Sequence, residues 1–150
     1  MVNHPVRPSK SIGMKTAAIS LLSIFMISNP LSQYQWENRV LLIFSESQEK
    51  ITEQKTKWFE DRKGLDDRDL VIFEFNNKHG KTPDHVMLKA KQVNWFYDNY
   101  NSDNREFKVV LIGKDGGAKL EKTAYLSREE LFATIDGMPM RKREMKDDLR

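Results

Sequence analysis

The chain has 150 residues, 39% hydrophobic and 31% charged, which is enough for one globular domain with its own core and too short for two. Its net charge of +3 comes entirely from residues 1–32, which carry Arg7, Lys10 and Lys15 and no acid, so that 22 cations and 22 acids balance from Gln33 onward. A neutral body argues against nucleic-acid binding, and the lack of cysteine excludes a thiol-disulfide oxidoreductase or peroxiredoxin activity of its own, as well as thiolate metal sites.

Residues 1–32 are predicted to be a signal peptide. A basic start precedes the apolar run Thr16–Ile27, and Pro30 follows it. The run is too short to span a bilayer, which takes about 20 residues. Export to the periplasm or the medium is therefore expected, with no stable membrane span after cleavage. Met14 with Lys15 would make a second plausible start of translation. An uncleaved buried or amphipathic helix is the alternative, although the run shows no polar face.

The first strand expected in the mature chain is the apolar run Arg39–Phe44. Ser45 with Gln48 three residues later forms a capping-box pattern, which predicts a helix to about Lys63. Gly64 would then end this helix in a left-handed conformation.

The second strand is expected over Asp69–Phe75, at the edge of the sheet. A turn-rich stretch follows, after which Thr82 is predicted to cap a second helix with Pro83 in its first turn. The apolar stripe of this helix would run from Val86 to Tyr100.

A hairpin and a last helix complete the predicted domain. The third strand, Phe107–Gly113, is expected to turn tightly at Asp115-Gly116 into a more exposed fourth strand. Ser127 with Glu130 predicts the cap of the last helix, which Gly137 would end. The domain is expected over residues 33–140, with a charged tail over 141–150.

This order of elements predicts an α/β fold of the thioredoxin-like type, βαβαββα. Right-handed crossovers and short connections give a four-stranded mixed sheet of order 2-1-3-4, with helices on both faces.

Four blocks of the sequence resemble the family called domain of unknown function 4174. They read "RVLLIF", "GLDDRDLVIFEF", "FKVVLIGKDGGAKL" and "LSREELFATIDGMPMRKREM", within Trp36 to Met145. This is a thioredoxin-like family of small exported bacterial proteins, also found as modules of animal matrix proteins with sushi repeats. The resemblance implies a thioredoxin-like or peroxiredoxin-like scaffold without an established activity, and it assigns no catalytic residue.

The start of the first helix, Ser45–Gln48, is where redox-active proteins of this fold carry their reactive cysteine. A serine hydroxyl there is far harder to deprotonate than a thiol. The stretch before the third strand, "NREFKVV", also lacks the cis-proline of such enzymes. The junction is therefore interpreted as a helix cap and not as a catalytic site.

Other arrangements of reactive residues give no catalytic, cofactor or metal prediction. His79 and His85, with Asp84 between them, match no standard ligand spacing and are interpreted as exposed polar residues. No G-x-S-x-G elbow supports a serine hydrolase. Glu74, between two phenylalanines, is interpreted as a solvated residue near a strand end.

Two segments carry the candidate partner-binding residues. "GKDGG" is interpreted as a hairpin turn, with an anion cradle as the alternative. The basic, methionine-containing "MPMRKREMK" is either a solvated tail or a docking segment for an acidic partner. The candidate binding residues are Lys114, Met138, Met140, Arg141, Lys142 and Arg143.

The leading hypothesis is an exported, non-redox binding module for an unknown protein, polyanion or glycan. One alternative is an enzyme of cryptic chemistry, or a redox-related accessory protein that acts beside a thiol-bearing partner. The other is a structural component of the envelope or matrix.

Overall fold

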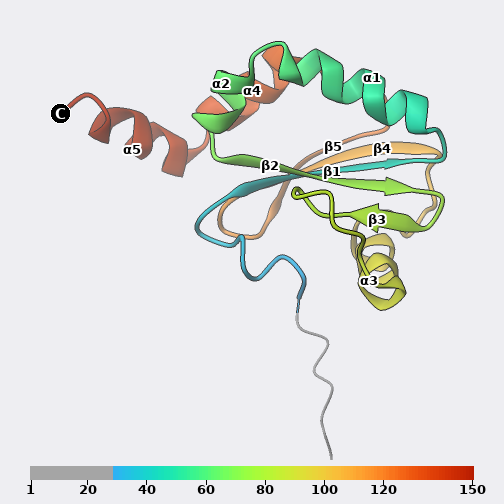
Figure 1. Cartoon of the computed structure of the whole chain (residues 1–150). Coiled ribbons are helices and arrows are strands. Elements are labelled where there is room, and N and C mark those ends of the chain that lie inside the picture. The colour runs from blue at the N-terminus through green and yellow to red at the C-terminus, as the bar shows by residue number, and fades with distance from the viewer. Residues whose placement is uncertain (1–28) are drawn as a thin grey trace, which may run out of the picture.

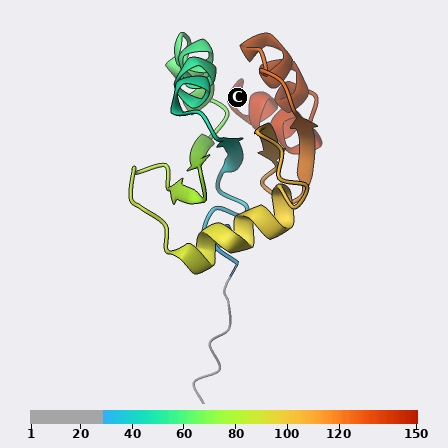
Figure 2. The same cartoon turned by 90° about the vertical axis from the view of Figure 1, so that its right-hand side faces the viewer.

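A computed structural model describes residues 29–150, so the predicted signal peptide lies almost entirely outside the described residues. A five-stranded mixed sheet of order β3-β2-β1-β4-β5 carries helices on both faces (Figures 1 and 2). No helix in this part of the chain is long and apolar enough to cross a membrane. The strands are β1 (Arg39–Ser45), β2 (Leu70–Asn76), β3 (His79–Lys81), β4 (Phe107–Ile112) and β5 (Ala118–Lys122), and the helices are α1 (Gln48–Phe59), α2 (Arg62–Asp66), α3 (Ala90–Tyr100), α4 (Arg128–Asp136) and α5 (Pro139–Asp147).

Strand β1 forms the middle of the sheet. It pairs in parallel with β2 and antiparallel with β4, so that Leu42 lies opposite Phe73 on one side and Val110 on the other. All of its residues are buried. The unbroken apolar run is thus explained by helices covering both faces of the strand.

The sheet has five strands and not the four expected, because β3 was predicted as part of a loop. Asn77 and Lys78 form the two-residue turn before it, with φ of 45° and 64°, the left-handed values that a tight hairpin needs. β3 pairs with Glu74–Asn76, so this half of β2 is not the sheet edge that the sequence suggested. Neither turn residue is glycine, which hid the hairpin.

One face of the sheet packs against α1, α2 and α4 (Figure 2). Leu41, Ile43 and Trp58 are fully buried there. The Trp58 indole Nε1 donates to the Leu126 carbonyl over 2.9 Å. The Gln54 amide exchanges two further hydrogen bonds with the Leu126 backbone, of 2.9 and 2.7 Å. This face is therefore closed by an apolar core whose few polar groups are paired.

Helix α3 covers the opposite face of the sheet (Figure 1). Aromatic rings make most of this contact. The ring centroid of Phe96 lies 5.3 Å from that of Phe73 and 4.8 Å from that of Phe75. Phe44 stacks on Phe75 at 4.7 Å. These spacings are those of favourable aromatic pairs, which fix α3 across β1 and β2.

The first helix begins two residues later than predicted. Ser47, not Ser45, is the N-cap, and its Oγ accepts from the Lys50 backbone N–H. Ser45 is still the last residue of β1 and is buried. The helix ends at Phe59, and Gly64 lies inside α2, where its N–H donates to Asp61 Oδ1. The predicted glycine stop is thus wrong.

The predicted helix start at Thr82 is also wrong, because this segment completes the sheet edge. The Leu88 N–H donates to the Gly80 carbonyl, which folds residues 82–88 back along β3. Thr82 Oγ1 accepts from the Val86 N–H within this turn, and Val86 is 61% exposed. Helix α3 starts only at Ala90.

The last part of the chain follows the prediction up to Gly137 and then differs. Ser127 caps α4, with its Oγ accepting from the Glu130 N–H. Gly137 ends α4 in an ordinary right-handed conformation, and α5 begins at Pro139. The segment 141–150 that was expected as a charged tail is helical as far as Asp147.

Candidate functional site

The carboxyl ends of the parallel strands β1 and β2 are the usual position for a ligand in an α/β sheet. A hollow of about 180 Å³ lies there. Its lining is entirely polar or aromatic and comes from the β1–α1, β2–β3 and α3–β4 junctions: Ser45, Glu46, Asn77, Lys78, Tyr97, Asn101, Asn104 and Arg105.

Most polar groups of this hollow are bonded to one another. Ser45 Oγ accepts from the Ser47 N–H over 3.0 Å. The buried Asn101 amide accepts from the Arg105 N–H and donates to its carbonyl. Lys78 Nζ donates to Asn104 Oδ1 over 2.9 Å. No histidine lines the hollow to act as a base for Ser45, so the geometry is that of a stabilised loop junction.

The remaining reactive residues singled out in the sequence do not assemble. His79 and His85 are both exposed, and the described residues hold no group of three or more potential metal ligands. Glu74 differs from its prediction as a solvated residue. It is only 9% exposed and forms an ion pair with Lys55 of α1, since β3 and α1 enclose it.

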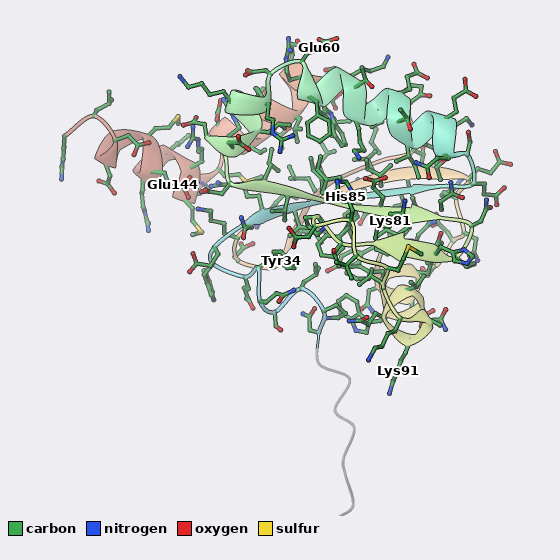
Figure 3. The ribbon with its side chains drawn as sticks, viewed as in Figure 1. Tyr34, Glu60, Lys81, His85, Lys91 and Glu144 are labelled. Carbon is green, nitrogen blue, oxygen red and sulfur yellow. The ribbon has the colours of Figure 1, made fainter. Side chains whose placement is uncertain are left out.

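Buried charges gather at the opposite end of the sheet, where α5 meets the amino end of β1 (Figures 1 and 3). Arg39, the first residue of β1, is 1% exposed. Its Nη2 donates to both Glu144 carboxylate oxygens over 3.1 Å, and its Nη1 donates to the Arg68 carbonyl over 2.9 Å. Glu144 of α5, labelled in Figure 3, is therefore the counter-ion of a buried cation.

Lys114, in the β4–β5 turn, joins the same carboxylate. Its Nζ lies 2.8 Å from Glu144 Oε1 and 2.7 Å from Asp69 Oδ2. Burial alone would lower the pKa of Lys114, but the two carboxylates outweigh it and raise that pKa. Burial likewise would raise the pKa of Glu144, but Lys114 and Arg39 hold it below its ordinary value. Both groups therefore stay ionised near neutral pH.

Arg141 completes the attachment of α5. It is 4% exposed, and its guanidinium pairs with Asp67 and Asp136, while its Nη1 donates to the Asp67 carbonyl over 2.8 Å. Arg68 reaches the same Asp136 at 2.6 Å. Two of the six candidate binding residues, Lys114 and Arg141, are thus occupied by ion pairs inside the protein.

The other four candidates lie at the start of α5 and keep part of their surface exposed, although Met138 also packs against the core. Met138 and Met140 are half-buried, whereas Lys142 and Arg143 are exposed, and no ion pair within residues 29–150 involves either cation. A hollow of about 100 Å³ lies between this helix start and the β4–β5 turn. Its lining residues are Arg39, Gly113, Lys114, Asp115, Lys119, Met138, Pro139 and Met140.

The sequence prediction missed three residues of this region: Arg39, Lys119 and Glu144. Arg39 carried one readable signal, since it is the only charged residue in a strand that is otherwise apolar up to Ser45. A cation in such a strand needs a buried carboxylate. Glu144 follows Arg141 at helical spacing, but only the fold shows that it reaches β1.

Comparison with known proteins gives a family without a named activity. A family model described as "Domain of unknown function (DUF4174)" matches residues 30–144. The match includes β1 to β5 and most of α5, up to the residue that pairs with Arg39. No curated protein and no solved structure gave a significant match.

Proposed function

We propose that this chain, which belongs to the DUF4174 family, is a non-redox binding module that docks an acidic partner at the start of α5. The observation that carries the proposal is the buried network of Arg39, Lys114, Arg141 and Glu144. It fixes a short, strongly charged helix against the sheet, although that helix buries little apolar surface of its own. Such anchoring is well suited to presenting a rigid surface.

The accessible residues of this surface favour an acidic partner. Lys142 and Arg143 are exposed cations without an ion-pair partner in the described chain, and Met138 and Met140 lie beside them. Exposed cations attract acidic groups over about 8 Å at physiological salt. Methionine side chains adapt to irregular partner surfaces. Because the chain from Gln33 onward is neutral as a whole, Lys142 and Arg143 included, the attraction is local and does not favour a nucleic acid.

A charge-reversal pair tests the docking surface. Labelled poly-glutamate is titrated with the protein, and Lys142→Glu with Arg143→Glu is expected to weaken binding roughly tenfold or more. The matched control reverses Lys50 and Lys63, which are also exposed and lie on α1 and α2. An equal loss of binding in both variants would mean that only the net charge matters. Unchanged binding after reversal of Lys142 and Arg143 would contradict the proposal.

We propose further that the fold is thioredoxin-like and that the protein is exported. The parallel β1–β2 pair, the β4–β5 hairpin and helices on both faces support the first statement. The basic, then apolar, composition of residues 1–32 supports the second. Amino-terminal sequencing of protein from the exported fraction should begin near Gln33. A mature chain that retains Thr16–Ile27 would contradict export with cleavage.

The enzyme alternative places its site at the carboxyl end of β1. Asn77, Lys78 and Asn104 border that hollow and all have positive φ, between 45° and 64°. Such backbone conformations occur preferentially at functional sites. Replacing Lys78 by Met would remove one of the two cations of the hollow, the other being Arg105, and a loss of function in this variant would favour the alternative.

A further inference from the structure

We infer that the hollow between the β4–β5 turn and the start of α5 binds a carboxylate group of the partner protein. The hollow has about 100 Å³, roughly the volume of three water molecules at about 30 Å³ each. This volume suits a single carboxylate group. The inference rests on the proposed function for its choice of a protein carboxylate over a free anion.

A buried hydrogen-bond donor of Arg39 points to this ligand. Arg39 forms part of the wall of the hollow and is 1% exposed. Its two terminal nitrogens donate to Glu144 and to the Arg68 carbonyl, but its Nε–H donates to no group of the protein. A buried, unpaired donor on a charged group is unfavourable, and an oxyanion bonded to Nε–H would remove this penalty.

The start of α5 is a second, independent source of donors. Met138 occupies the N-cap position and offers no side-chain acceptor to the first turn of the helix. Pro139 has no N–H, and the Met138 N–H donates to the Ile135 carbonyl over 2.9 Å, so the Met140 N–H is the free backbone donor at this end of the hollow. The helix dipole gives this end a partial positive charge. Met138, Pro139 and Met140 all line the hollow.

The cations of the lining offer an anion short-range partners, although their charge is already balanced within the protein. Arg39, Lys114 and Lys119 line the hollow together with Asp115, while Glu144 and Asp69, which are not lining residues, pair with Arg39 and Lys114. Asp115 is itself bonded to Lys119 Nζ over 2.6 Å and to the Gly117 N–H over 3.0 Å. The half-buried Met138 and Met140 make the rest of the wall apolar, which suits the side chain that carries a carboxylate better than a fully hydrated phosphate ion.

The nitrogen–proton NMR signal of the Arg39 Nε–H in the full-length protein gives a direct test. The probe is acetyl-Glu-Glu-amide, with acetyl-Gln-Gln-amide as the neutral control and inorganic phosphate as the free anion. The acidic dipeptide is expected to shift this signal saturably, and the neutral one is not. No shift with the acidic dipeptide, or a shift with phosphate alone, would overturn the inference.

The variant Met138→Asp supplies an internal carboxylate that caps α5. It should melt at or above the temperature of the parent protein while binding the dipeptide roughly tenfold more weakly. The control Ser47→Asp changes the N-cap of α1 in the same way and should leave binding within about twofold. If Met138→Asp fails to fold, Lys119→Gln replaces it and should weaken binding several-fold. Unchanged binding in the folded variant contradicts the assignment.

The two proposals fail in different ways. If poly-glutamate binding depends on Lys142 and Arg143 while the dipeptide leaves the Arg39 signal unmoved, the docking surface stands and the carboxylate hollow is wrong. If the dipeptide shifts Arg39 but charge reversal at Lys142 and Arg143 has no effect, the hollow stands and the docking surface is wrong.

Discussion

The two ends of strand β1 handle polar groups in opposite ways. At the carboxyl end, Ser45 is neutral, and its hydroxyl needs only one short hydrogen bond to the next turn. At the amino end, Arg39 carries a charge that is fully buried, so a carboxylate has to be brought from distant Glu144. A buried charge thus dictates long-range structure, whereas a buried hydroxyl is satisfied locally. The position of α5 follows from this requirement.

Removing the Glu144 carboxylate should cause the largest loss of stability among the changes considered. Glu144→Ala leaves the Arg39 guanidinium buried with only one backbone acceptor, and we expect a loss of about 3 kcal/mol in the free energy of unfolding. Urea unfolding followed by the fluorescence of buried Trp58 measures it. Asp147→Ala on the same helix, at an exposed position, is the control and should change stability by less than about 0.5 kcal/mol. Equal effects would mean that the ion pair does not anchor α5.

At the carboxyl end of β1, a serine-to-aspartate change should cause a smaller loss of stability, and the loss should differ between Ser45 and Ser47. Ser45→Asp places a carboxylate at a site that is 3% exposed, and we expect a loss of about 2 kcal/mol. Ser47→Asp keeps an acceptor at the N-cap and should be neutral within about 0.5 kcal/mol. Thermal melting of the two variants decides between them. If Ser45→Asp melts like the parent protein, the cap lies at Ser45 after all.

A substitution in the β4–β5 turn, beside the buried charges, should cause the next largest loss of stability. Gly116 has φ of 83°, which confirms the predicted turn, and its N–H donates to the Gly113 carbonyl over 2.9 Å. Gly116→Ala should cost about 1 kcal/mol, because a side chain is strained at positive φ. Gly117→Ala, next to it without a positive φ, should cost less. Equal melting temperatures would show that the glycine is not required at position 116.

The smallest effect concerns pH. The pKa of Glu144 in the folded protein lies below its ordinary value of 4.5 because Lys114 and Arg39 outweigh the effect of burial. The unfolded chain therefore binds the proton more readily, and the stabilisation is present above about pH 4.5 and lost as pH falls through the lower folded pKa. Unfolding of Glu144→Gln should show a weaker decline in stability on the acid side than Asp147→Asn. Parallel declines would contradict this linkage.

The sequence correctly predicted the features that depend on short-range patterns along the chain. Residues 39–44 were recognised as a buried strand from their apolar run, Ser127 as a cap from its spacing to Glu130, and Gly116 as a turn residue from the dipeptide that contains it. Each of these depends only on neighbours along the chain.

The failures have a common physical cause, which is that tertiary pairing decided between two local options. Thr82 has a good capping pattern, but the chain around it is used by the hairpin of β3. Ser45 and Ser47 are both good caps, and only the length of the pairing between β1 and β2 selects Ser47. Arg141 and Lys142 are adjacent in the sequence and were both predicted to bind a partner, yet Arg141 is buried while Lys142 is exposed.

One NMR titration tests the central claim that binding occurs at the amino end of β1 and not at its carboxyl end. Poly-glutamate is added to the labelled full-length protein, and backbone amide shifts are compared at the two ends. We expect saturable shifts within Gly113–Gly117 and Met138–Glu144, with Ser45–Gln48 and Lys78 unmoved. Shifts confined to Ser45–Gln48, Lys78 and Arg105 would contradict this expectation and place the functional site at the carboxyl end of β1.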